Sequence, residues 1–400
     1  MPDVFPPAVP GYGTGPGVTV QTRARPEFDS LGTRVGGALV HAQIDESVGF
    51  DSNVTGGAPG RGGWLVRTSP SVLVGSTGRR DPYGLYVSLD NTRYPGLPGQ
   101  DRTNWTAGGG ATFAVGEDRL TLGAAHLSLY QAPGDLDALP TDQPVAYRVD
   151  DLRLGYALGR LTLEPSLDAA AWRFGGATVQ GVPVAQSYRN RDVVQGGLTI
   201  RYEVAPQRDL VLALRGADQL YVATPQGAAS PNSRSVAVLA GIDHAIDGLW
   251  RYRVLAGYER RGFAAGSYRP HGAVVSEADA IFTPGGMTTV TASLTRGIED
   301  AAQEGVAGYT YTGAKLMVDY EWRRDLLLQA SGGVQRADLL GGGAQTALRA
   351  GIGATWLVNR RVRVTGTYDF GDTRGTGGRG SGLSGSFTRS LGLLTVRLAL

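Results

Sequence analysis

The 400-residue chain contains no cysteine, a single lysine and no long apolar run. The absence of cysteine excludes disulfide bonds and thiolate metal sites. The longest apolar runs, such as residues 236–242, are the size of a strand, whereas a membrane-spanning helix needs about 20 apolar residues. The sequence therefore excludes a helical membrane protein but leaves open a β-barrel, in which lipid-facing and inward-facing residues alternate.

Charge is also scarce. Charged residues make up 18% of the chain, below the usual ~25%, and the net charge is +2. No basic patch with interleaved aromatic residues is present, so nucleic acid is not an expected partner. Glycine, in contrast, is abundant at 61 residues, about twice its usual share of ~7%.

In much of the chain, apolar and polar residues alternate with a period of two. In residues 34–50, Val40, Ile44 and Val48 fall on one face, while His41 and Asp45 fall on the other. This period is that of a β-strand with one apolar and one polar face. We count eighteen such segments between residue 34 and the C-terminus, and no helical periodicity.

The connections between these segments alternate in length, with nine long loops and eight short turns. In an up-and-down sheet this order places all long loops at one end, as in outer-membrane barrels with long extracellular loops and short periplasmic turns. The sequence predicts an all-β fold, a transmembrane antiparallel barrel of about 18 strands over residues 34–400. Residues 1–33 are rich in Pro and Gly and are expected to form a poorly ordered periplasmic segment. Residues 1–18 lack the features of a signal peptide.

Tryptophan lies at the ends of the expected strands, where amphipathic aromatic side chains favour the two lipid–water interfaces. Trp172 is out of phase with Leu163 and Leu167 on its strand, which indicates a bulge or a different register. Glu46 breaks the apolar face of its strand and is expected near an interface. The predicted aromatic girdle consists of Trp64, Trp105, Trp250, Trp322 and Trp356.

The residues that alternate with the apolar, lipid-facing ones are predicted to line the lumen. The two signs of charge are mixed, with a modest excess of Arg, so mutual ion pairing and ion selectivity are both open. An Arg excess would suit an acidic polymer. The predicted lining comprises His41, Asp45, Arg67, Asp90, Arg153, Arg201, Arg215, Arg251, Arg253, Glu259, Lys315, Asp319, Arg349, Arg363 and Arg397.

Two short stretches flank the first strand and carry a family resemblance. They are residues 23–32, RARPEFDSLG, and residues 49–54, GFDSNV. Both resemble the second-type β-barrel porin family of the outer membrane, which combines an RPE-Y/F-D-x-L-G lead-in with a Y/F-D-x-N strand end. The resemblance implies a porin-like barrel in the outer membrane. Because such genes often lie beside exopolysaccharide genes, it also implies a role in exopolysaccharide export.

We therefore expect an outer-membrane channel, with outer-membrane lipid, a polysaccharide and periplasmic export components as partners. A non-transporting scaffold or surface-binding barrel is the alternative, and a soluble β-protein is the least favoured interpretation. An enzyme would need catalytic partners from strands adjacent to His41 or His126, because His41 and Asp45 lie ~13 Å apart along one strand. No catalytic, cofactor or metal site is expected.

Overall fold

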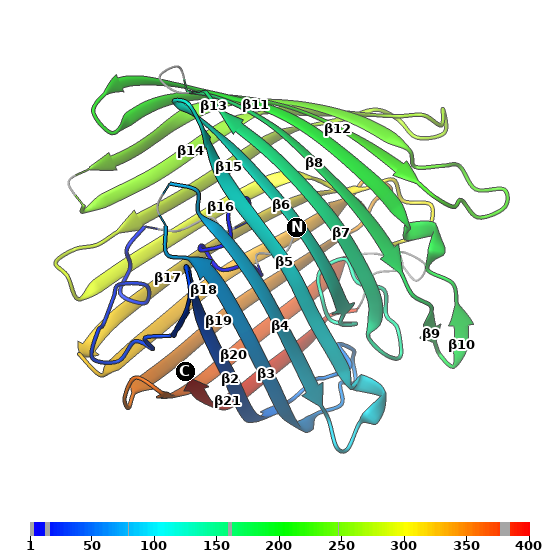
Figure 1. Ribbon diagram of the computed structural model, residues 1–400. Helices are drawn as coiled ribbons and strands as arrows, with labels where there is room; N and C mark the ends of the chain where they lie inside the picture. Colours follow the sequence, from blue (N-terminus) through cyan, green and yellow to red (C-terminus); the bar gives the residue numbers. More distant parts are fainter. Residues whose placement is uncertain (1–3, 13–16, 79, 159–161, 247, 377–384) are drawn as a thin grey trace.

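The computed structural model describes residues 4–12, 17–78, 80–158, 162–246, 248–376 and 385–400 (Figure 1). Strands dominate it, with only two short 3-10 turns, η1 (Pro98–Gln100) and η2 (Ser187–Arg189). The strands are β1 (Thr33–Val35), β2 (Ala38–Asp51), β3 (Gly63–Ser76), β4 (Tyr83–Arg93), β5 (Arg102–Val115), β6 (Asp118–Gln131), β7 (Val145–Ala157), β8 (Thr162–Phe174), β9 (Ala177–Val179), β10 (Val182–Val184), β11 (Arg191–Ala205), β12 (Arg208–Tyr221), β13 (Ser233–Ile246), β14 (Trp250–Phe263), β15 (His271–Phe282), β16 (Thr288–Glu299), β17 (Tyr309–Arg323), β18 (Leu326–Leu339), β19 (Ala344–Leu357), β20 (Val362–Thr376) and β21 (Phe387–Ala399).

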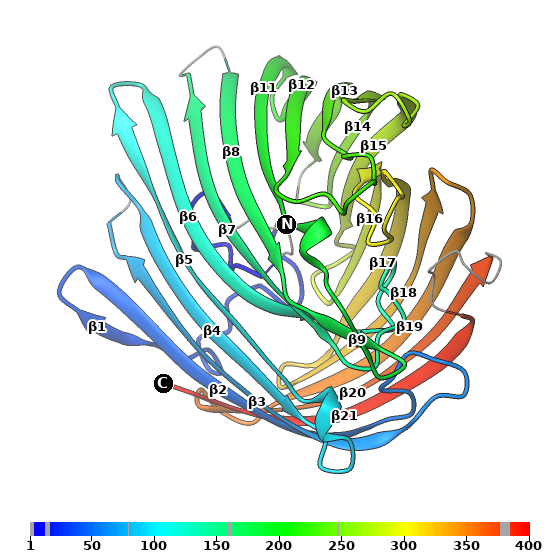
Figure 2. The same cartoon turned by 90° about the vertical axis from the view of Figure 1, so that its right-hand side faces the viewer.

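The main sheet closes on itself as an antiparallel barrel (Figures 1 and 2). Each barrel strand pairs with its neighbours along the chain, and β2 pairs with the last strand, β21. Short β1 only extends the edge of β2, and β9 and β10 form a separate hairpin, so the wall has the eighteen strands that were predicted. No helix among the described residues is long and apolar enough to cross a membrane.

Apart from the connection between β18 and β19, which is shorter than the turns of residues 77–82 and 283–287, the connections sort by length as the sequence predicted. The long loops lie at the extracellular end and the short turns at the periplasmic end, beside the start of β2 and the end of β21. The loop between β18 and β19 is shorter than expected, residues 340–343 rather than 337–343, because β18 continues to Leu339. The expected turn at Gly159–Arg160 and most of the last long loop lie outside the described residues.

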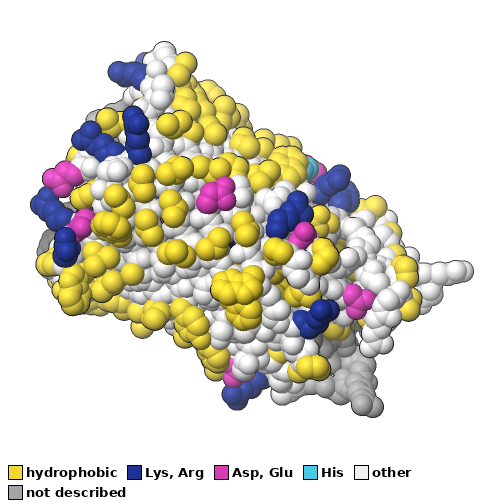
Figure 3. All heavy atoms as spheres, turned by 90° about the horizontal axis from the view of Figure 1, so that it is seen from below, with side chains coloured by type: hydrophobic (Ala, Val, Ile, Leu, Met, Phe, Trp, Pro, Cys, Tyr) yellow, Lys and Arg dark blue, Asp and Glu magenta, His cyan; other side chains and the backbone are white. Residues whose placement is uncertain are grey.

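Exposed apolar side chains cover the outer wall, and Figure 3 shows them as a band with charged side chains towards both ends. The five tryptophans of the predicted girdle are all exposed on this face. Trp172 was out of phase because it faces the lumen, in register with fully buried Val149 on β7. Glu46 is exposed on the outer face and accepts a hydrogen bond of 2.8 Å from the Thr68 hydroxyl.

Candidate permeation pathway

Strand alternation places one side chain of every two on the inner wall. On β2, Val48 and Phe50 are exposed on the lipid side, while Ser47 and Asp51 are buried on the lumen side. The same phase on β7 exposes Leu152 and buries Asp151. The inner wall therefore carries the polar residues, and they define the route across the barrel.

The N-terminal segment differs from the expected separate periplasmic region. Its described residues, 4–12 and 17–32, run inside the ring of strands, as Figure 2 shows. Residues 1–3 and 13–16 lie outside the described part. A composition rich in Pro and Gly is typical of disorder, but here the barrel wall supplies the apolar surface that the segment lacks by itself.

The first anchor of this segment is apolar. Phe5, Val9 and Tyr12 are buried, and they form one cluster with Leu127 and Val149 of the wall. The Tyr12 hydroxyl donates a 3.1 Å hydrogen bond to the carbonyl of Asp151. The guanidinium of Arg153 lies 4.6 Å from the centre of the Tyr12 ring, within the range of a cation–π contact.

Glycines on the inner wall make room for this anchor. A Cβ on Gly123 would lie 2.6 Å from the Tyr12 ring, and one on Gly108 would lie 2.5 Å from the Phe5 ring. At Gly84 and Gly110 a Cβ would overlap the backbone carbonyls of the segment itself. These four glycines form a groove in which the segment lies against bare backbone, which explains part of the high glycine content.

The second anchor contains the motif that resembles the porin family. Val20 is buried against Leu327 and Leu357, and its amide donates a 3.0 Å hydrogen bond to the Thr289 hydroxyl. Both Arg23 and Arg25 form ion pairs with Glu321, the latter at 2.8 Å.

The end of the motif joins the segment to the last strands. Asp29 pairs with Arg363 at 2.9 Å, and Arg360 donates a 2.7 Å hydrogen bond to the Pro26 carbonyl. The RPEFD sequence therefore fixes the segment inside the barrel, a role that the sequence did not reveal.

The seam between β2 and β21 is closed by inward-facing polar pairs. Asp45 pairs with Arg397 at 2.7 Å, directly across the seam. Asp51, which is fully buried, pairs with Arg389 at 2.5 Å and accepts a hydrogen bond from the Tyr94 hydroxyl at 3.3 Å. The second family stretch thus lies at the seam, so both stretches hold the two ends of the barrel together.

Five other charged residues of the predicted lining, Arg67, Asp90, Arg153, Arg201 and Arg215, have partners of opposite sign. Arg67 pairs with Asp90 on the neighbouring strand. Arg153 pairs with Asp168 at 2.8 Å, Arg201 with Asp243 at 3.0 Å, and Arg215 with Glu277. The structure thus favours mutual ion pairing along the wall, one of the two alternatives that the sequence left open.

The remaining predicted lining residues lie beside the segment, beside neutral groups or, in the case of Arg253, in register with two aspartates. His41 lies beside Gly32, and Arg251 beside Gly17. Asp319 accepts hydrogen bonds from Gln21, at 3.3 Å, and from Gln329, at 2.8 Å. Arg253 lies in register between Asp243 and Asp279. Lys315 lies in register between Ser293 and Gly333. Arg349 donates a 3.4 Å hydrogen bond to the Thr373 hydroxyl.

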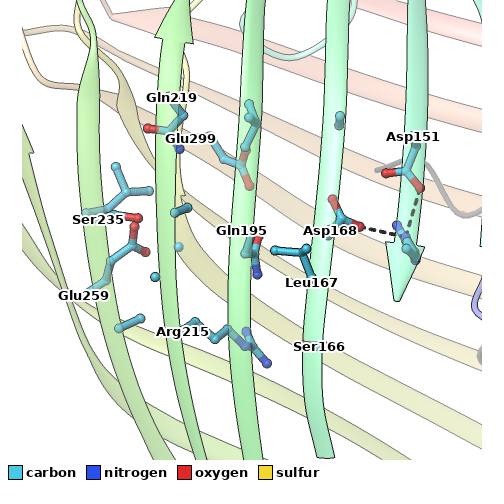
Figure 4. Close-up of a pocket in the computed structure, with 18 of the residues that line it drawn as sticks. Asp151, Ser166, Leu167, Asp168, Gln195, Arg215, Gln219, Ser235, Glu259 and Glu299 are labelled. Atoms are coloured by element: carbon cyan, nitrogen blue, oxygen red, sulfur yellow. Dashed lines mark hydrogen bonds and ion pairs between the residues drawn. The ribbon is translucent and has the colours of Figure 1, made fainter. Parts of the chain in front are cut away.

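A cavity of about 670 Å³ remains between the N-terminal segment and the wall formed by β6–β8 and β11–β16. Figure 4 shows its polar lining, in which Gln195, Gln219 and Ser235 lie around Glu259 and Glu299. Among the described residues neither glutamate forms an ion pair with an arginine, whereas Arg153, Arg191 and Arg215 each bind a carboxylate. The lining holds more carboxylates than arginines, so the Arg excess expected from the sequence is not a property of this cavity.

The third long loop, residues 132–144, crosses the extracellular mouth. Asp137 lies in it with a positive φ of 59°, and its amide donates a 2.7 Å hydrogen bond to the Gln345 side chain of β19. Its carboxyl group accepts a 2.7 Å hydrogen bond from the Ala302 amide. Burial raises the pKa of Asp137 to about 7. This loop therefore narrows the mouth and is held there by a carboxyl group that titrates near neutrality.

Candidate catalytic partners of the histidines were also located. His126 lies 2.6 Å from Asp150 on the next strand, but both face outward, and the imidazole packs on Trp105. His41 lies opposite Leu73. Within the described ranges, no group of three or more His, Asp or Glu residues could hold a metal ion.

Comparison with solved structures gives outer-membrane barrels of low similarity. The outer-membrane protein OpdK of Pseudomonas aeruginosa is 12% identical, with a TM-score of 0.49 over 90% of this chain and 99% of that one. OccK2 (OpdF) of the same organism is 13% identical, with a TM-score of 0.49 over 91% and 97%. The FrpB iron transporter of Neisseria meningitidis is 12% identical, with a TM-score of 0.47 over 86% and 64%.

No curated protein matches the chain. A family model, in contrast, matches residues 25–398, which is nearly the whole barrel together with the last part of the lumenal segment. The match begins in the RPEFD motif, shortly before β2, and ends in β21, the strand that pairs with β2 at the seam. The chain therefore belongs to the family described as "Putative beta-barrel porin 2", and it is a porin-like barrel of the outer membrane.

Proposed function

We propose that the barrel is a passive channel for hydroxyl-rich solutes and that it takes part in exopolysaccharide export. The observation that carries the proposal is the composition of the cavity wall. Gln195, Gln219 and Ser235 offer neutral donors and acceptors, and Glu259 and Glu299 offer carboxylate acceptors. Sugar hydroxyls are both donors and acceptors, so such a wall can replace the water that a sugar loses on entry.

Ion pairing on the wall supports the same class of cargo. A channel for a strongly charged solute needs an excess of one sign at its constriction. Here several arginines of the wall bind neighbouring carboxylates, as Arg153 binds Asp168, Arg201 binds Asp243 and Arg215 binds Glu277, and paired charges give only a weak long-range field. Hydrogen bonding rather than net charge is then the main source of selectivity.

The N-terminal segment limits this transport. It occupies the lumen beside the cavity, and its anchors lie on β4–β7 on one side and on β16–β20 on the other. A sugar polymer is far bulkier than a water molecule, so its passage requires the segment to leave at least one anchor.

Planar-bilayer recordings of the full chain test this function. We expect stepwise channel currents and concentration-dependent block by neutral oligosaccharides added to one side. A Glu259→Gln and Glu299→Gln double variant should conduct but be blocked more weakly. Folded protein that never conducts, even after removal of residues 1–25, would refute the channel. Currents without sugar block would refute the cargo class.

A second candidate is a non-transporting surface barrel, and the filled lumen is the observation that favours it. The N-terminal segment and the loop of residues 132–144 both occupy space that a wide channel would leave open. In that case conductance should be absent in the full chain and should appear only when both obstacles are removed. Loss of surface polysaccharide in a deletion strain would instead support export.

A further inference from the structure

A row of alternating arginines and threonines crosses the outer wall near the extracellular end. It consists of Arg296 on β16, Thr312 on β17, Arg336 on β18, Thr346 on β19 and Arg374 on β20. Each member is the direct register partner of the next. Alternate strands are ~10 Å apart, so the row presents three guanidinium groups at regular intervals.

This row faces lipid rather than the lumen. It has the same phase as Leu294, Val334 and Leu348, which are exposed on the outer wall. These apolar residues lie two positions closer to the periplasmic end on β16, β18 and β19, and they are linked in register through Ala314. Arg296 and Arg336 therefore lie directly above exposed apolar surface, and Arg374 lies above Asp372, the register partner of Leu348.

The spacing along each strand places the row at the extracellular interface. Trp322 and Thr312 on β17 are separated by ten positions (322 − 312), and so are Trp356 and Thr346 on β19 (356 − 346). Both tryptophans are exposed at the periplasmic end. A strand crosses the hydrocarbon layer in ~9–11 residues, so one crossing separates the aromatic girdle from the row.

The arginines have only weak partners within the protein. Arg296 donates to the Thr312 hydroxyl at 2.5 Å and to the Val274 carbonyl at 3.1 Å, and no carboxylate pairs with it among the described residues. Arg336 and Arg374 pair, each at 2.7 Å, with Asp338 and Asp372 on their own strands. Exposed pairs of this kind contribute little to stability, so they leave the guanidinium groups available.

We propose that this row binds the phosphate groups of lipid headgroups in the extracellular leaflet. The planar guanidinium donates two parallel hydrogen bonds to a phosphate, and the threonine hydroxyls can donate to the same oxygens. Leu294, Val334 and Leu348 then contact the acyl chains of the bound lipid. An arginine that faces lipid near the hydrocarbon layer is energetically unfavourable, and electrostatic attraction to an anionic headgroup offsets this unfavourable free energy.

The test compares lipids that differ only in phosphate. Folded full-length barrel in detergent is titrated with diphosphorylated lipid A and its dephosphorylated form, and bound lipid is counted by native mass spectrometry. We expect the diphosphorylated form to bind more tightly by at least tenfold. In the triple variant Arg296→Gln, Arg336→Gln and Arg374→Gln its affinity should fall about fivefold for each arginine. Equal binding of the two lipids by wild-type protein, whether or not the variant folds, would overturn the proposal.

A matched control removes the same charge at the periplasmic end. The triple variant Arg208→Gln, Arg323→Gln and Arg324→Gln should retain the affinity of the wild type for the diphosphorylated lipid. Equal loss in both triple variants would overturn the proposal, because it would show a net-charge effect. Displacement of the lipid by millimolar inorganic phosphate would also overturn it, in favour of a site for free anions.

Discussion

Docking of the N-terminal segment in the lumen leads to a prediction for the replacement of Tyr12. Replacement by Ala removes a buried aromatic ring, a hydrogen bond to Asp151 and a cation–π contact with Arg153. These losses are worth ~3–5, ~1 and ~0.5–1 kcal/mol, respectively. The total of about 5 kcal/mol corresponds to a shift of more than about 1,000-fold in the docking equilibrium of the segment. We therefore expect Tyr12→Ala to raise the single-channel conductance.

The absence of cysteine allows a direct measurement of docking. Val9→Cys introduces one thiol at a fully buried position of the first anchor. Its modification by a soluble maleimide should be slow in an otherwise wild-type chain and faster by orders of magnitude with Tyr12→Ala. The control is Tyr202→Ala, which removes an exposed tyrosine from the lipid side of the wall and should change neither rate nor conductance.

An independent perturbation acts from the wall. The Cβ introduced by Gly84→Ala overlaps the Ala8 carbonyl and lies 3.0 Å from the Val9 Cα, so its nearest neighbours belong to the segment. We expect the same rise in labelling and conductance. Unchanged labelling and conductance in both variants, with the barrel folded, would show that the segment does not occupy the lumen in the membrane.

Three further predictions concern the mouth, the seam and the cavity. The pKa of the Asp137 carboxyl group is raised to about 7, so the folded state favours its protonated form. The stability that protonated Asp137 contributes is therefore present at low pH and is lost as the pH rises from about 4 through 7. Current fluctuations should therefore increase as the pH rises from about 4 to 7 in wild-type protein and level off above pH 7. Asp137→Asn should abolish this pH dependence, and fluctuations that are independent of pH in the wild type would contradict the assignment. Arg397→Gln breaks the charged hydrogen bonds to Asp45 and should lower the free energy of unfolding by about 1–3 kcal/mol in urea titrations, and a change within error would contradict a role at the seam. Glu259→Gln with Glu299→Gln should reduce cation selectivity, measured as the zero-current potential in a KCl gradient, and an unchanged potential would place these carboxylates outside the ion path.

The strands of the wall could be predicted from local patterns, because the alternation within each strand shows which of its side chains face lipid. Alternation in residues 34–50 identified one face of β2, and the same counting located the strands and the two levels of tryptophan. Loop lengths then gave the sidedness, since they depend only on neighbouring strands. Partners across the seam followed as well, because the first and last strands of a closed barrel must pair.

The contents of the lumen could not be read in this way. Residues 4–12 contain apolar side chains such as Phe5, Val9 and Tyr12, but they show no strand or helix period, and their stability depends on a groove formed by strands far along the chain. Two signals were nevertheless present. Glycines such as Gly84 and Gly110 occupy inner-face positions, and the RPEFD motif is rich in charge for a supposedly disordered leader. Asp137 gave no such signal, because its partners belong to loops and strands distant in sequence.

The lumenal segment can also be regarded as a ligand tethered to its own binding site. It joins β2 at the periplasmic end, where the chain enters the wall, so it can undock without breaking any strand pairing. A short tether gives an effective concentration in the millimolar range. A cargo that binds the same groove therefore competes with millimolar segment, and even weak affinity is sufficient when the cargo is abundant. The channel would then open in proportion to the concentration of its own cargo.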